Sequence, residues 1–260
     1  MSTLQHIFLS FLISGGWIAT ATWIAERYGS RVGGLLVNLP SNLLVSLVFI
    51  ALLRGPSYAA QAAMAVPVGM AINSLYLTIF NAFVTRSLWM ALTVGLFFWW
   101  IAALCFFALQ LSAFVSLMVY VWVLLTTFWL NEKVLHIKTP KPQPKKWSTA
   151  GFVLRIVFSG TLVASVVAVS LLATPWVTGI FSTFPAVMTS SMVILTLTQG
   201  AFFARATSKI LILSSANILV YAFIVHIAYP VFGVWLGTLC AYAGSVVFVI
   251  LLYPFLRRLA

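Results

Sequence analysis

The chain consists of long apolar runs separated by short polar or basic breaks. At about 20 residues per membrane crossing, this pattern predicts nine transmembrane helices joined by short connections. The first run has no positively charged segment before it and is longer than the core of a signal peptide, so we expect it to remain as a helix. We place the spans at 4–25, 35–53, 61–84, 88–109, 112–130, 149–173, 180–198, 207–228 and 231–255.

Composition supports an all-α integral membrane protein. Hydrophobic residues make up 63% of the 260 positions and charged residues only 6%, with a mean hydropathy of +1.14. A soluble domain carries about 25% charged residues, because its surface needs polar cover. Cys105 and Cys240 lie in apolar runs without the spacing of metal ligands, so we expect packing residues, no metal site and no cofactor.

The charges predict an orientation. The chain has 14 Lys and Arg residues against two acids, Glu26 and Glu132. With nine alternating spans, every basic residue except Arg54 falls on one side, which the positive-inside rule assigns to the cytoplasm. We therefore expect an inner or plasma membrane protein with its N-terminus outside and its C-terminus in the cytoplasm. The basic run 138–146 either contacts anionic headgroups or is a solvated linker that fixes orientation.

An internal repeat is indicated by matches at one ungapped offset of 145 residues. It places Gly34 and Pro40 on Gly179 and Pro185, and it relates further glycines, serines and tyrosines. The unit is four spans, and the two copies begin five crossings apart, so they would run oppositely through the bilayer. We expect a first four-helix repeat at 1–110, a linker helix and basic cytoplasmic loop at 111–148, and a second repeat at 149–260. The other matched pairs are Ser14-Gly15 with Ser159-Gly160, Ala19 with Ala164, Ser46 with Ser191, Val48 with Val193, Gly55 with Gly200, Ala59 with Ala204, and Tyr76 with Tyr221.

A short motif carries a resemblance to a known family. The segment Thr178-Gly-Ile-Phe-Ser-Thr-Phe-Pro185, followed by an apolar run that ends at Thr198-Gln-Gly200, resembles the signature of GlpM-like small inner-membrane proteins. Those proteins are about half as long and carry one unit. The resemblance implies a fused tandem over residues 10–110 and 155–255. The first copy departs from it with Leu39-Pro40 in place of Phe-Pro, and the resemblance implies no substrate.

Candidate binding residues surround the two matched prolines. Pro40 and Pro185 each lie about six residues into an apolar span, where proline removes a backbone hydrogen bond and breaks the helix. The freed carbonyls are tolerated in a bilayer only beside protein or a cavity, so we expect a central substrate site here. The alternative is a packed kink whose hydroxyls bond to their own helices. The substrate-binding candidates are Asn38, Pro40, Ser41, Asn42, Ser182, Thr183, Pro185, Thr189 and Ser190.

Two further residues have two interpretations each, and four glycines have one. Arg54 either contacts an anionic substrate at the outer mouth or extends to the membrane interface; its repeat partner is Gln199. His226 either relays protons or bonds to a backbone carbonyl. Gly69, Gly95, Gly237 and Gly244 are expected to let helices approach closely.

These features favour a secondary transporter or facilitator of a small anionic or organic solute, since inverted repeats and broken helices recur in such proteins. No acid lies mid-membrane, which argues against carboxylate-based ion coupling. No catalytic motif is visible, so we expect no enzyme, although a Ser/His enzyme that uses Ser159 or Ser190 with His226 stays open. A lipid-type flippase and a non-transporting subunit or assembly factor stay open as well. The expected partners are a small-molecule or lipid substrate and the bilayer. Nucleic acid is not an expected partner, because the basic residues are scattered. A homodimer is left open.

Overall fold

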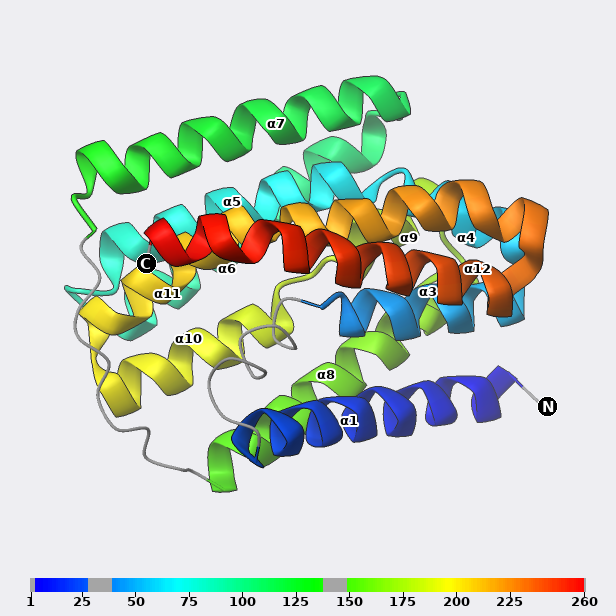
Figure 1. The fold of residues 1–260 in the computed structure, drawn as a ribbon, viewed down its shortest axis with the longest axis horizontal. Coiled ribbons are helices and arrows are strands. Elements are labelled where there is room, and N and C mark those ends of the chain that lie inside the picture. Colours follow the sequence, from blue (N-terminus) through cyan, green and yellow to red (C-terminus); the bar gives the residue numbers. More distant parts are fainter. Residues whose placement is uncertain (1–2, 28–38, 138–148, 260) are drawn as a thin grey trace.

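The computed structural model describes residues 3–27, 39–137 and 149–259, and every regular element in this part of the chain is helical. The predicted all-α class is therefore confirmed, and the helices form one elongated bundle (Figure 1). The elements are α1 (Thr3–Arg27), α3 (Ser41–Arg54), α4 (Pro56–Ala63), α5 (Val66–Phe83), α6 (Leu88–Ala108), α7 (Ala113–Trp129), the π-helical turn η1 (Leu130–Val134), α8 (Thr149–Val169), α9 (Pro175–Ser182), α10 (Ala186–Gln199), α11 (Ala201–Ser214) and α12 (Ala216–Leu259).

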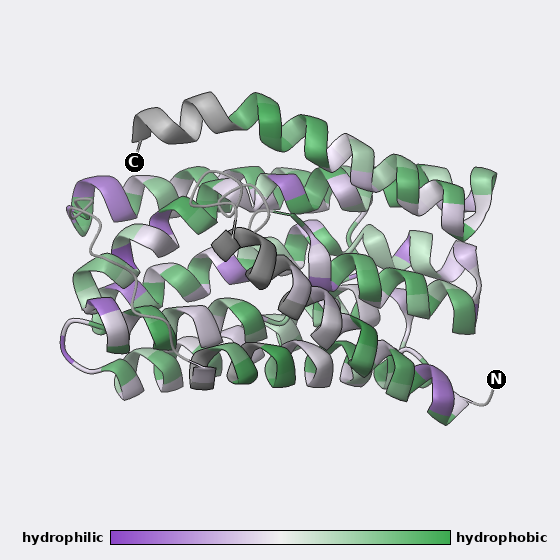
Figure 2. Ribbon diagram, turned by 60° about the horizontal axis from the view of Figure 1, so that its bottom comes forward, coloured by the Kyte–Doolittle hydropathy of each residue, from purple (hydrophilic) through white to green (hydrophobic). Residues whose placement is uncertain are grey.

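The outer surface of the bundle is apolar. Large hydrophobic side chains such as Trp122, Leu239 and Leu251 are exposed on it, and most of the ribbon is hydrophobic by residue (Figure 2). Exposed apolar patches of this extent mark contact with a membrane or partner rather than water. Within the described residues, five stretches are long and apolar enough to cross a bilayer, as a membrane protein requires. They are Val66–Phe83, Leu88–Ala108, Ala113–Val134, Pro175–Gln199 and Ala201–Leu252, and Ser41–Arg54 and Ile156–Val169 are shorter apolar helices.

Several expected spans differ from the helices observed. The run at 61–84 is interrupted after Ala63, and α5 begins at Val66, where Pro67 in the first turn loses no helical hydrogen bond. The run at 180–198 is divided between α9 and α10. Hydropathy alone misses such breaks, because the residues at each break are themselves mostly apolar.

Conversely, the runs at 207–228 and 231–255 share one long helical element. Helix α12 reverses direction at Gly233, where φ is 73° and ψ is −178° (Figure 1). Of the run expected at 35–53, residues 35–38 lie outside the described residues, and α3 begins at Ser41. The described part of the chain therefore has more, and on average shorter, helices than nine uninterrupted spans.

Helices α1 and α8 lie side by side and run in opposite directions (Figure 1). Two glycines bring them together: a Cβ at Gly160 would lie 2.7 Å from the Phe11 ring, and one at Gly15 would lie 2.9 Å from Ile156. The side chains of Ser14 and Ser159 hydrogen-bond across this contact. Close glycine-mediated packing of this kind is a main source of helix association in membranes.

Connections gather at the two ends of the bundle. The α5–α6 turn, η1 and the α10–α11 turn lie at one end, on the left in Figure 1. The start of α1, the α3–α4 turn, the α6–α7 connection and the reversal at Gly233 lie at the other end.

The four glycines expected to permit close helix contact do so, since a Cβ at each would meet a neighbouring side chain or backbone atom at 3.0 Å or less: Gly69, Gly95, Gly237 and Gly244.

Candidate functional site

Helices α3 and α10 both begin inside the bundle, each directly after a proline. Pro40 has φ −77° and ψ 52°, and Pro185 has φ −80° and ψ 39°. In both cases the next residue donates its N–H to the carbonyl just before the proline: Ser41 to Leu39 and Ala186 to Phe184, each at 2.8 Å. Neither helix start has a side-chain cap. Beyond these two amides, the next N–H groups of the first turn in each helix have no helical or side-chain acceptor and are available to a ligand.

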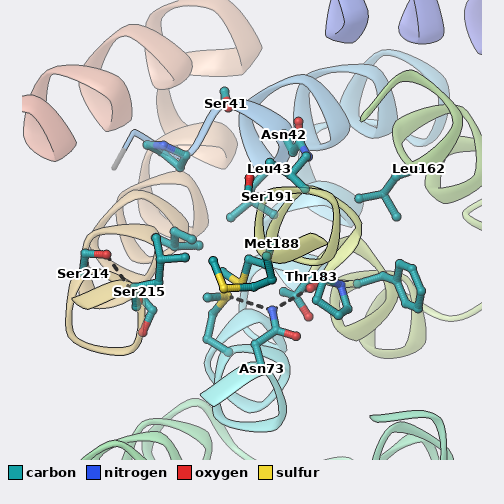
Figure 3. A pocket seen from close by; sticks show the side chains of 18 of the residues that line it. Ser41, Asn42, Leu43, Asn73, Leu162, Thr183, Met188, Ser191, Ser214 and Ser215 are labelled. Atoms are coloured by element: carbon teal, nitrogen blue, oxygen red, sulfur yellow. Dashed lines mark hydrogen bonds between the residues drawn. The ribbon is translucent and has the colours of Figure 1, made fainter. Parts of the chain in front are cut away.

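A cavity of about 440 Å³ lies where these two helix starts meet. Residues of α5, α8, α11 and α12 complete its wall, and Asn73 of α5 points toward Thr183 and Met188 (Figure 3). Its size is within the range of small-molecule sites. The lining residues are Leu39–Leu43, Met70, Asn73, Leu162, Ser182–Pro185, Val187, Met188, Ser191, Met192, Leu195, Gln199, Phe203, Thr207, Leu211, Ser214, Ser215 and Ile218.

Most of the residues predicted from sequence line this cavity, and two do not. Thr189 is buried elsewhere, with its hydroxyl 2.8 Å from that of Tyr76. Ser190 donates to the Val187 carbonyl of its own helix at 3.0 Å. Asn38 lies outside the described residues. The predicted residues that line the cavity are Pro40, Ser41, Asn42, Ser182, Thr183 and Pro185.

Several of these side chains already have protein partners. The hydroxyls of Ser182 and Thr183 donate to the carbonyls of Gly179 and Ile180, each at 2.6 Å. The Asn42 side-chain oxygen accepts from Ser159 at 2.7 Å. The two hydroxyls satisfy backbone carbonyls at the end of α9, Asn42 joins the start of α3 to α8, and the polar atoms of all three form part of the wall.

Asn73 is the central polar residue that the sequence did not assign to the site. Its amide nitrogen donates to the Thr183 carbonyl at 2.7 Å, and its oxygen accepts from Trp99 Nε1 at 2.8 Å. Thr183 lies in the break before Pro185, so Asn73 supplies the donor that a continuous helix would provide. Gly69, one turn earlier on α5, makes room for Thr183, because a Cβ there would collide with it. The only sequence signal was an amide one helical turn after a glycine in an apolar run.

The wall of the cavity is uncharged among the described residues. Its polar groups are hydroxyls and the amides of Asn42, Asn73 and Gln199, set among methionine, leucine and phenylalanine side chains. The Gln199 side-chain oxygen is buried and has no hydrogen-bond partner among the described residues. No group of three or more His, Cys, Asp or Glu side chains gathers anywhere in the described ranges.

Arg54 and His226 lie outside this cavity. Arg54 is exposed, donates to the Leu171 carbonyl at 2.9 Å and places its guanidinium 4.6 Å from the centre of the Tyr58 ring. His226 Nδ1 lies 2.9 Å from the Ala60 carbonyl oxygen, which matches the carbonyl-bonded interpretation.

The chain matches no protein-family model, no curated protein and no solved structure.

Proposed function

We propose that the chain is a secondary transporter or facilitator that binds a small organic solute in the central cavity between α3 and α10. The observation that carries this proposal is that two helices begin after matched prolines inside the bundle and face one cavity. Discontinuous helices whose N-termini point at a central site recur in secondary transporters.

We further propose that these helices belong to two repeats of opposite orientation. Helices α3 and α10 have 14 residues each and occupy positions 145 apart. Each ends at a glycine of the same unusual conformation: Gly55 has φ 92° and ψ 157°, and Gly200 has φ 89° and ψ 163°. The two helices leave the centre toward opposite ends of the bundle (Figure 1). A fused tandem of GlpM-like units is consistent with this arrangement.

Alternating access follows from two such halves that rock against each other. The cavity includes Gln199, Phe203 and Thr207, which belong to α10 and α11 near the turn that joins them. In the proposed orientation this turn is cytoplasmic, so the cavity extends toward the cytoplasm. Toward the other end, α4 and α9 pack tightly: Ala59, Ala62 and Ala63 are buried, and a Cβ at Gly179 would collide with the Ala62 carbonyl.

The chemistry of the cavity wall favours a substrate that has an uncharged, apolar body and one oxygen-bearing group. The apolar side chains suit hydrocarbon, and the uncapped N–H groups of two helix starts suit a carbonyl, hydroxyl or carboxylate oxygen. A carboxylate would be compensated for its lost hydration only at these N–H groups, because no charged side chain among the described residues lines the cavity.

The test is uptake into liposomes that contain the purified chain, measured over a panel of radiolabelled organic acids, alcohols and amides. Ser191 lines the cavity, whereas Leu197 on the same helix is 73% exposed. We expect Ser191→Trp to reduce uptake at least tenfold and Leu197→Trp to leave it unchanged. Equal uptake by both folded variants would contradict a site in this cavity. A folded wild-type protein that moves no solute would instead favour the non-transporting subunit.

A further inference from the structure

A second apolar crevice, of about 280 Å³, opens on the outer surface of the bundle between α6, α8 and the α9–α10 junction. Three side chains at its rim are substantially exposed: Trp100 by 41%, Val157 by 46% and Phe158 by 42%. These residues lie in the middle parts of α6 and α8, so the crevice opens at mid-depth of the predicted membrane. The remaining lining residues are Thr161, Leu162, Ser165, Phe181, Phe184 and Ala186.

Leu162 and Phe184 line both this crevice and the central cavity. Phe184 lies in the non-helical step between α9 and α10. Its ring packs edge-on against Trp99 at 4.9 Å and lies 5.8 Å from Trp100, measured between ring centres. The two spaces therefore share a thin partition made of one aliphatic and one aromatic side chain. Rotation of these two side chains would join the two spaces without movement of a whole helix.

We propose that the crevice is a lateral portal through which an amphipathic molecule with a hydrocarbon tail enters the central cavity from the bilayer. This inference rests on the proposed function, because it names the class of substrate for the same cavity. A water-soluble solute gains nothing from a mouth at mid-membrane, since it would first have to enter hydrocarbon. A hydrocarbon tail already lies there, and the crevice lining matches it with aromatic and aliphatic side chains and two hydroxyls.

The energetics favour passage of the hydrocarbon tail through the crevice rather than tight binding of the tail there. Moving a methylene group from lipid into an apolar crevice exchanges one hydrocarbon environment for another, so the usual gain in free energy on leaving water is absent. The polar end gains the N–H donors of two helix starts in the central cavity, beside Ser41 and Met188, whereas the crevice offers it two hydroxyls. The head would therefore lie in the cavity while the tail lies in the portal.

A photoreactive probe tests the portal directly. Liposomes of phosphatidylcholine that contain the purified chain are irradiated with one of two palmitic acid analogues, which carry a diazirine in mid-chain or near the carboxyl end, and the adducts are mapped by peptide mass spectrometry. We expect the mid-chain analogue to form adducts at Thr161 and Ser165 in the crevice and the analogue with the diazirine near its carboxyl end to form adducts at Met188 in the cavity. Ser165→Trp, which fills the crevice, should reduce labelling of Met188 at least fivefold. The matched control is Val153→Trp, at a position on the same helix that is 51% exposed and outside the crevice.

Phe184→Ala provides a test in the opposite direction, and it should raise Met188 labelling at least twofold. The portal is overturned if Met188 is not labelled in the wild type, or if labelling is the same in Ser165→Trp and Val153→Trp. Uptake measured on the same liposomes separates this proposal from the transporter. If Ser165→Trp reduces the labelling of Met188 but no solute is transported, the portal is retained and the transporter is rejected. Transport of a water-soluble solute that Ser191→Trp abolishes and Ser165→Trp leaves unchanged would retain the transporter and reject the portal.

Discussion

The side-chain oxygens of Ser14 and Ser159 lie 2.7 Å apart, although 145 positions separate the two residues in the sequence. The same separation relates Pro40 to Pro185. A two-fold axis brings equivalent residues together where it passes between them, so the axis of the proposed repeat would run through the α1–α8 contact. Ser159 uses its single proton to donate to Asn42, which makes Ser14 the donor to Ser159.

These consecutive hydrogen bonds link α1 and α8, one from each proposed repeat, to the start of α3. Ser159→Ala removes two hydrogen bonds and Ser14→Ala removes one. At about 0.6–1.7 kcal/mol per interhelical bond, we expect Ser159→Ala to lower the free energy of unfolding by about 1–3 kcal/mol and Ser14→Ala to lower it by about half as much. Unfolding in detergent micelles measures both. Thr20→Ala is the control, because the Thr20 hydroxyl is exposed and bonds only to its own helix; a loss as large for Thr20 would refute the assignment.

The α1–α8 contact predicts opposite effects for two glycines. A Cβ at Gly160 would lie 2.9 Å from the Phe11 carbonyl oxygen, whereas a Cβ at Gly16 would meet nothing within 4 Å. Overpacking costs about 1–3 kcal/mol, and replacing glycine by alanine within a helix gains about 0.5–1 kcal/mol. We expect Gly160→Ala to lower the melting temperature in micelles and Gly16→Ala to leave it unchanged or raise it. The reverse order would show that α1 and α8 do not pack in this way.

The matched turns at Gly55 and Gly200 predict that replacing either glycine lowers the stability of the protein by the same amount. Their backbone conformation is almost exclusive to glycine, and forcing another residue into it costs about 1–3 kcal/mol. Nothing lies within 4 Å of a Cβ at either position, so the cost comes from the backbone alone. Gly55→Ala and Gly200→Ala should therefore destabilise the protein by similar amounts in chemical unfolding. A cost at one glycine only would weaken the proposed repeat.

The proposed orientation predicts which ends a water-soluble thiol reagent reaches in intact cells. Cys105 and Cys240 are first replaced by alanine, since both are exposed on the bundle surface. Ser57→Cys and Thr85→Cys then place single thiols at exposed positions near opposite ends. We expect an impermeant maleimide to label position 57 from outside and position 85 only after the cells are opened. Labelling of position 85 in intact cells would invert the topology.

The class of fold and six residues of the cavity wall could be predicted from the sequence for clear physical reasons. Apolar runs must be helical in a bilayer, and proline breaks a helix wherever it lies in the interior, so Pro40 and Pro185 could be assigned directly. The hydrogen bonds of Asn73 could not be predicted, because its partners Trp99 and Thr183 are distant in the sequence. Thr189 and Ser190 are near Pro185 in the chain, but the helical rotation of α10 turns them away from the cavity.

The uncharged wall of the central cavity has a consequence for energetics. Each elementary charge that moves across 100 mV changes the free energy by about 2.3 kcal/mol. In the proposed transport cycle the wall of the empty cavity moves no such charge, since no charged side chain among the described residues lines it. The wall would then add no voltage dependence to the return of the unloaded protein, and voltage dependence that arises at the site would come from the charge of the cargo itself.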